Sequence, residues 1–94
     1  MSEIRREVAG SKGRYLTEVD GHAAELTYSI ASPALVIADH TGVPDAIRGS
    51  GVGIRLVERL VADARAEGFR IVPLCPFVNA QRRRHPDWAD AFST

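Results

Sequence analysis

A glycine-rich segment, Arg48-Gly49-Ser50-Gly51-Val52-Gly53, is the part of the chain best suited to bind an anion. It lies between a predicted strand and a predicted helix, and the free amides at a helix start attract phosphate groups. Glycines there let the backbone approach a phosphate without hindrance from a Cβ atom. A Walker loop would end in Gly-Lys-Ser/Thr, and a dinucleotide fingerprint would have a third glycine in place of Ile54. The segment therefore predicts a phosphate site of another kind, with a plain strand-to-helix turn as the alternative.

Cys75 and His40 are the candidates for acid–base or nucleophilic chemistry. Cys75 ends a predicted strand just before a helix start at Pro76, where the field of the helix lowers the pKa of a thiol. His40 ends another predicted strand, and an imidazole there could accept a proton near neutral pH. The alternatives are a buried, inert cysteine and a histidine that only packs at its strand end. Asp39 is a weaker candidate for the base.

The first half of the chain has the patterns of a β-sheet. Residues 4–8 predict an edge strand, and alternating residues up to position 19 predict a second strand. Asp20-Gly21 predicts a hairpin turn, because both turn positions need a positive φ, and the return strand covers residues 23–30. Ala34-Leu35-Val36-Ile37-Ala38 is continuously apolar, which is typical of a central strand covered on both faces.

The second half changes to a helical period. Apolar residues from Val52 to Ala64 recur at helical spacing, and Gly68 is placed to end this helix. Residues 69–75 predict another strand, and a short helix runs from Pro76 to His85-Pro86. We predict an α+β fold in the order β-β-β-β-α-β-α, with an α/β-type three-layer arrangement and two parallel strands within residues 35–75. The tail with Trp88 and Phe92 is expected to pack back on the domain, or else to form a partner surface.

Composition limits the class of protein. Ninety-four residues with 45% apolar content predict a single folded domain over residues 1–94. Twelve basic residues balance twelve acidic ones, which argues against binding nucleic acid or a membrane through overall charge. One cysteine allows neither an internal disulfide nor a multi-thiolate metal site, and no metal is predicted. The N-terminal residues lack the apolar stretch of a signal peptide, so we expect a cytoplasmic protein, as a monomer or a weak homodimer.

The glycine segment matches the pattern Arg/Gln-x-x-Gly-x-Gly/Ala through Arg48, Gly51 and Gly53. Together with the stretches 40–44, 72–76 and 84–86, it resembles the GNAT superfamily of acetyl-CoA-dependent N-acetyltransferases, more narrowly its minimal yjdJ-type branch. The resemblance implies a GNAT-like mixed sheet with a β-loop-α-β acetyl-CoA site. It also implies that an acetyl group moves to an amine, either a small amine or a protein lysine or N-terminus. A non-catalytic acyl-CoA-binding module acting through a protein partner is the alternative.

The resemblance also assigns residues to acetyl-CoA. Residues 48–53 (Arg48, Gly49, Ser50, Gly51, Val52 and Gly53) would hold the pyrophosphate, and Asn79 would contact the pantetheine or a nearby phosphate. The pantetheine arm would lie between two splayed strands, with backbone amides near Thr41 and Val43 polarising the thioester carbonyl.

The catalytic residues follow less directly from the resemblance. Cys75 and His40 could face each other across the cofactor, and one arginine of residues 82–84 could reach the 3′-phosphate, although a solvated helix end is the simpler account. Many larger relatives have a tyrosine on the last helix as general acid, whereas His85-Pro86 stands at its expected place here. Water or Cys75 is then left to supply that proton.

Overall fold

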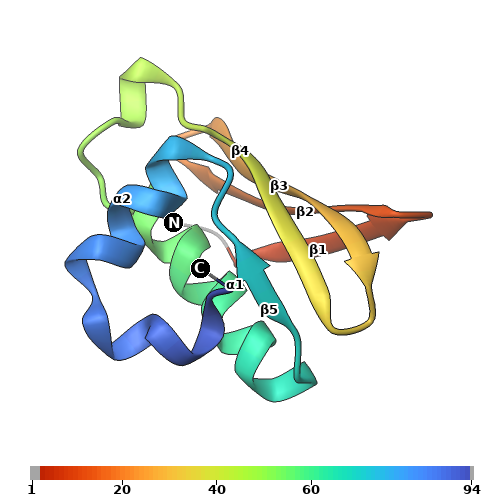
Figure 1. The fold of residues 1–94 in the computed structure, drawn as a ribbon. Coiled ribbons are helices and arrows are strands. Elements are labelled where there is room, and N and C mark those ends of the chain that lie inside the picture. The colour runs from red at the N-terminus through yellow and green to blue at the C-terminus, as the bar shows by residue number, and fades with distance from the viewer. Residues whose placement is uncertain (1–2, 94) are drawn as a thin grey trace.

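The computed structural model describes residues 3–93; Met1, Ser2 and Thr94, which the single-domain prediction includes, lie outside the described residues. Residues 3–93 form five strands and two α-helices, and Figure 1 shows how they are arranged. The strands are β1 (Arg5–Ala9), β2 (Lys12–Val19), β3 (His22–Ser32), β4 (Leu35–Gly42) and β5 (Arg70–Val72). The helices are η1 (Asp45–Ile47), α1 (Val52–Glu67), α2 (Pro76–Arg84) and η2 (Pro86–Ala91), where η marks a 3-10 helix. None of the helices described within residues 3–93 is long and apolar enough to cross a membrane.

The strands form one mixed sheet in chain order, β1-β2-β3-β4-β5. The first four strands are antiparallel, and β5 pairs parallel with β4 through Leu35–Ile37 and Arg70–Val72. The predicted α+β class, the mixed sheet and the element order are therefore confirmed. The hairpin between β2 and β3 is confirmed as well, because Asp20 has a φ of 51° and Gly21 a φ of 79°.

Both α-helices lie together on one side of the sheet (Figure 1). The side chains that they cover form one apolar cluster with residues of the strands, including Tyr15, Leu26 and Tyr28. On β4, Val36 and Ala38 are buried, whereas Leu35 and Ile37 are only half-buried. The predictions of a three-layer arrangement and of a β4 covered on both faces are wrong, because the helices of the described chain gather on the Val36 side.

A polar cluster attaches α1 to the first two strands. The Tyr15 hydroxyl donates a hydrogen bond of 2.7 Å to Asp63, and Arg6 forms ion pairs with Asp63 and Glu67. Burial and then the hydrogen bond to Asp63 raise the pKa of the Tyr15 hydroxyl well above its ordinary value. These contacts fix the orientation of α1 relative to the sheet.

Strand β5 is shorter than predicted, and its early end opens the sheet. Pro73 has no N–H to donate to a ladder, so β5 stops at Val72 rather than at Cys75. The Leu74 amide donates back to Val72 at 3.0 Å, and the Cys75 amide then donates to the Ala38 carbonyl at 2.8 Å. Strand β4 continues to Gly42 beyond this contact, so its last part has no β5 partner. The strands splay apart at this point.

The C-terminal tail packs back on the domain, which was the first of the two expectations for it. Trp88 and Phe92 are buried, and Phe92 forms an isolated parallel bridge with Ile71 on β5. The 3-10 turn of η2, which places Trp88, was not predicted.

Candidate functional site

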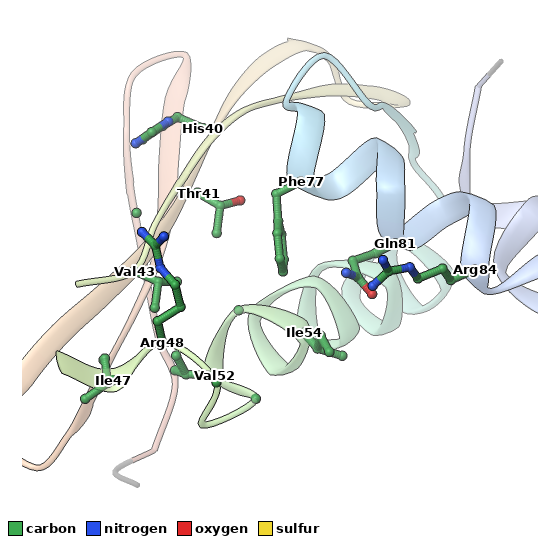
Figure 2. A pocket seen from close by; sticks show the side chains of 14 residues that line it. His40, Thr41, Val43, Ile47, Arg48, Val52, Ile54, Phe77, Gln81 and Arg84 are labelled. Atoms are coloured by element: carbon green, nitrogen blue, oxygen red, sulfur yellow. The ribbon is translucent and has the colours of Figure 1, made fainter. Parts of the chain in front are cut away.

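A cleft of about 680 Å³ lies where β4 and β5 separate, between the end of β4, the first turn of α1 and one side of α2 (Figure 2). Its walls combine backbone of the glycine segment with apolar and basic side chains. The lining residues are His40, Thr41, Gly42, Val43, Ile47, Arg48, Gly49, Gly51, Val52, Gly53, Ile54, Phe77, Gln81 and Arg84. The splay predicted between the two strands is thus the site of this cleft.

The backbone at the start of α1 is arranged to receive an anion. Gly51 precedes the helix with a φ of 86°, a conformation that L side chains rarely adopt. The first bond of the α-helical pattern runs from the Arg55 amide to the Gly51 carbonyl, so the amides of Gly53 and Ile54 have no intrahelical acceptor. No acidic residue stands in the first turn, and the N-cap residue Gly51 has no side chain that could cap the helix; the Val52 amide makes one long hydrogen bond of 3.4 Å to the Ser50 hydroxyl. The positive end of α1 is therefore uncompensated and lies against the cleft.

Gly53 packs closely against the Phe77 ring. A Cβ atom at this position would lie 2.9 Å from Cζ of Phe77, closer than real Cβ contacts come. Figure 2 shows the Phe77 ring extending from α2 into the space between Thr41 and α1. The absence of a side chain at Gly53 thus lets α2 approach the start of α1 and sets the width of the cleft.

Two arginines give the rim of the cleft a positive charge. The Arg48 side chain is 74% exposed and forms a surface ion pair of 2.9 Å with Asp45. Arg84, at the end of α2, is also exposed and lines the cleft. Both side chains are free to reorient toward an anionic ligand, because a surface ion pair contributes little to stability.

Cys75 lies behind the cleft and not on its surface. Its side chain is 3% exposed, and Sγ is 3.4 Å from the Thr41 hydroxyl, which does line the cleft. Cys75 is the N-cap residue of α2 and makes no side-chain capping bond. The thiol is therefore shielded from a ligand in the cleft.

His40 and Cys75 do not face each other. Figure 2 shows the His40 ring projecting from β4 away from Phe77, whereas Thr41 points toward it. The cause is an irregularity in β4: Tyr28 pairs with Ala38, but Thr27 pairs with His40, so Asp39 is an extra residue. A one-residue insertion exchanges the two faces of a strand, so Thr41 takes the inward position that plain alternation gives to His40. Asp39 is engaged elsewhere, since its carboxylate accepts a 2.6 Å hydrogen bond from Ser29.

Two residues assigned to acetyl-CoA from the sequence do not line the cleft. Ser50 turns back on the loop, where its hydroxyl accepts a long hydrogen bond of 3.4 Å from the Val52 amide. The Asn79 carbonyl oxygen accepts two hydrogen bonds from Arg82, at 3.0 and 2.9 Å. The other assigned residues of the cofactor site, Thr41, Val43, Arg48, Gly49, Gly51, Val52 and Gly53, all lie along the cleft.

Phe77 and Gln81 line the cleft and were not singled out from the sequence. They lie on one side of α2 with Arg84, at spacings of four and three residues. Residues at these spacings share a helix face. The spacing of Phe77, Gln81 and Arg84 in the sequence was therefore the signal available for this shared face.

Comparison with known proteins agrees with this geometry. A model of the GCN5-related N-acetyl-transferase family matches residues 14–91. The chain belongs to this family. A solution structure of a protein from Staphylococcus aureus, described as GCN5-like and provisionally as an N-acetyltransferase, is similar with a TM-score of 0.71 and 27% identity. The match covers 99% of this chain and 91% of that protein. No curated protein matches the sequence significantly.

Membership of the GCN5-related family supports acetyl transfer as the general activity. The residues of the cleft fit the group that such a reaction uses. The open amides of α1 suit a pyrophosphate, and the interior between Val43 and Phe77 suits an uncharged arm.

Proposed function

We propose that the protein is an acetyl-CoA-dependent N-acetyltransferase that moves an acetyl group to an amine, either a small amine or a protein lysine or N-terminus. The observation behind this proposal is the start of α1. Gly51 has a positive φ, the first turn of the helix lacks an acidic residue, and Gly51 and this first turn line the cleft. Amides in this arrangement bind phosphate, and Arg48 would add a charge-assisted contact to the pyrophosphate. Residues 48–53 would hold that end of acetyl-CoA.

The acetyl end would lie where β4 and β5 separate. The half-buried residues Thr41 and Val43 line the cleft beyond the last contact between the strands, at Ala38. In this part of β4, which pairs with β3 but has no partner on the β5 side, backbone amides would hydrogen-bond the thioester carbonyl and stabilise the oxyanion that forms on it. The amine nitrogen would attack that carbonyl, the C–S bond would break, and the CoA thiolate would take up a proton. Cys75, whose Sγ lies 3.4 Å from the Thr41 hydroxyl, could exchange that proton.

The amine would approach from the face of the sheet that the helices leave open. His40 lines the cleft, but its ring is exposed and projects away from Phe77, so it could meet the acceptor. An imidazole in that position could take the proton that the amine loses. An open acceptor side predicts low selectivity among amines. We further propose that the protein acts as a monomer or weak homodimer in the cytoplasm, without nucleic acid.

A non-catalytic acyl-CoA-binding module is the second candidate, and one observation favours it. The thiol of Cys75 is buried behind Thr41, and the His40 imidazole points away from Phe77. Neither candidate catalytic group therefore reaches into the interior of the cleft. A protein that only holds acyl-CoA for a partner would need no such group.

Turnover measurements separate the two candidates. We would mix the protein with acetyl-CoA and a panel of amines and lysine peptides, and measure CoA release and acetylated product by mass spectrometry. If the protein is an enzyme, the amount of product scales with protein concentration, and His40→Ala lowers the rate of acetyl transfer. The control is His22→Ala, which changes an exposed histidine at the hairpin and should leave the rate unchanged. The binding module would be supported if acetyl-CoA binds, no acceptor gives product, and His40→Ala binds acetyl-CoA as the wild type does.

A further inference from the structure

Gln81 carries a buried polar group that the protein does not satisfy. Its side chain is 3% exposed, and within residues 3–93 its Oε1 is the only buried side-chain nitrogen or oxygen without a hydrogen-bond partner. Its backbone carbonyl, by contrast, has a partner 2.8 Å away in Nδ1 of His85. Leaving a buried amide oxygen unpaired costs stability, so buried polar groups almost always have partners. The exception calls for a partner from outside the chain.

The position of Gln81 indicates where that partner would lie. Gln81 lines the same cleft as the start of α1, one turn after Phe77 on the side of α2 that faces α1 (Figure 2). Arg48 and Arg84 are exposed at the rim, whereas Gln81 is enclosed. Anionic groups of a ligand would pair with these arginines at the rim, where they lose little hydration. The uncharged part of the ligand would enter the interior, because burying it costs less free energy than burying a charge.

A primary carboxamide accepts a hydrogen bond at its oxygen and donates from its nitrogen. Its complement is a group with a donor and an acceptor side by side, such as another amide. The pantetheine arm of CoA is uncharged and contains two secondary amides. We propose that Gln81 binds a secondary amide of this arm and so positions the acyl group at the splay of β4 and β5. This inference rests on the proposed use of acyl-CoA.

The test is a Gln81→Met variant, which keeps the length of the side chain and removes its hydrogen bonding. Ala66→Met is the matched control, because it places the same side chain on an exposed position of α1 that does not line the cleft and leaves the charge unchanged. Calorimetric titration would use CoA, 4′-phosphopantetheine and adenosine 3′,5′-bisphosphate. Gln81→Met is expected to weaken CoA and phosphopantetheine by the same factor, about three- to tenfold, and to leave the bisphosphate unchanged. A loss confined to CoA and the bisphosphate would place Gln81 against the nucleotide and overturn the proposal.

The free protein gives an independent readout. Since Gln81→Met removes a buried amide oxygen that has no partner, the melting temperature of the free variant should equal or exceed that of the wild type. A purely structural role for Gln81 predicts a lower melting temperature with unchanged CoA affinity, and that result would overturn the proposal.

Two further outcomes keep this inference separate from the proposed function. Wild-type protein that binds no CoA would refute the proposed function and this inference with it, whereas wild-type binding with equal affinity in Gln81→Met would refute this inference alone. If the variant does not fold, the side-chain amide signals of Gln81 in the wild type can be followed by NMR. They should shift when CoA or phosphopantetheine is added, and signals that stay in place at saturation would overturn the proposal.

Discussion

Replacing Gly51 by alanine tests the phosphate site, and the same helix supplies the control. Gly51 and Gly68 flank α1 at its two ends, with φ values of 86° and 80°. A Cβ atom added at either position would meet no other atom within 4 Å. The two substitutions therefore impose similar backbone strain without a steric clash. Only Gly51 lies on the cleft.

The expected loss of stability is small and equal for the two variants. An alanine in left-handed backbone costs about 1–2 kcal/mol, and the stiffer unfolded chain returns about 0.4–1 kcal/mol. Each variant should thus lower the free energy of unfolding by about 1 kcal/mol, which for a domain of this size lowers the melting temperature by about 4–8 °C. Thermal unfolding followed by circular dichroism measures both values.

The effect on ligand binding should differ sharply between the two variants. A methyl group at Gly51 occupies the space in which a phosphate would meet the open amides of α1, and hydrogen bonds to a charged group contribute about 1.5–3 kcal/mol. Gly51→Ala should therefore weaken CoA by about tenfold to a hundredfold, measured by calorimetry, while Gly68→Ala keeps the wild-type affinity. Equal CoA affinity in the two variants would refute the assignment of the pyrophosphate to the start of α1.

Three further predictions follow from individual contacts. Arg48→Ala should weaken CoA severalfold at low salt, less at high salt, and leave pantetheine unchanged in calorimetry; an equal loss for both ligands would contradict an ionic role. Gly53→Ala should lower the free energy of unfolding, measured in urea, by about 1 kcal/mol more in the wild type than in a Phe77→Leu background, because the added Cβ atom meets the Phe77 ring. Strictly additive effects of the two substitutions would exclude that contact. Tyr15→Phe should cost about 1–2 kcal/mol by loss of the bond to Asp63. The pKa of Tyr15 is raised in the folded state, so the free energy of unfolding of the wild type should fall above about pH 10, where the tyrosine of the unfolded chain ionises. A fall of the same size in Tyr15→Phe would show that Tyr15 is not its cause.

The local features of this fold were predictable from the sequence because short-range rules determine them. Asp20-Gly21 specifies its own turn, and the residues from Val52 to Gly68 carry both the period and the end signal of α1. The glycine segment was located for the same reason, since the residues that open the helix are contiguous. The segment lies on a cleft, and its role as a phosphate site stays a prediction.

The relative placement of distant residues was harder to predict. The extra residue at Asp39 reverses the faces of β4, so His40 turns away from Cys75, and no local pattern in the sequence signals such a bulge. The early end of β5 at Val72 depends on Pro73 and on the return of Cys75 to Ala38, a contact between residues far apart in the chain. The role of Gln81 depends on the distance between two helices. Sequence periodicity places a residue on a helix face but does not say what faces it.

The most direct test of the account is a titration of isotopically labelled protein with CoA, followed through backbone amide signals by NMR. The account predicts the largest shifts at Gly51, Gly53 and Ile54, the amides at the start of α1, at ligand concentrations that saturate binding. Gly21, in the hairpin turn away from the cleft, serves as the internal control and should not move. Saturation with CoA that leaves the Gly51, Gly53 and Ile54 signals in place would contradict the central claim that this helix start holds the pyrophosphate.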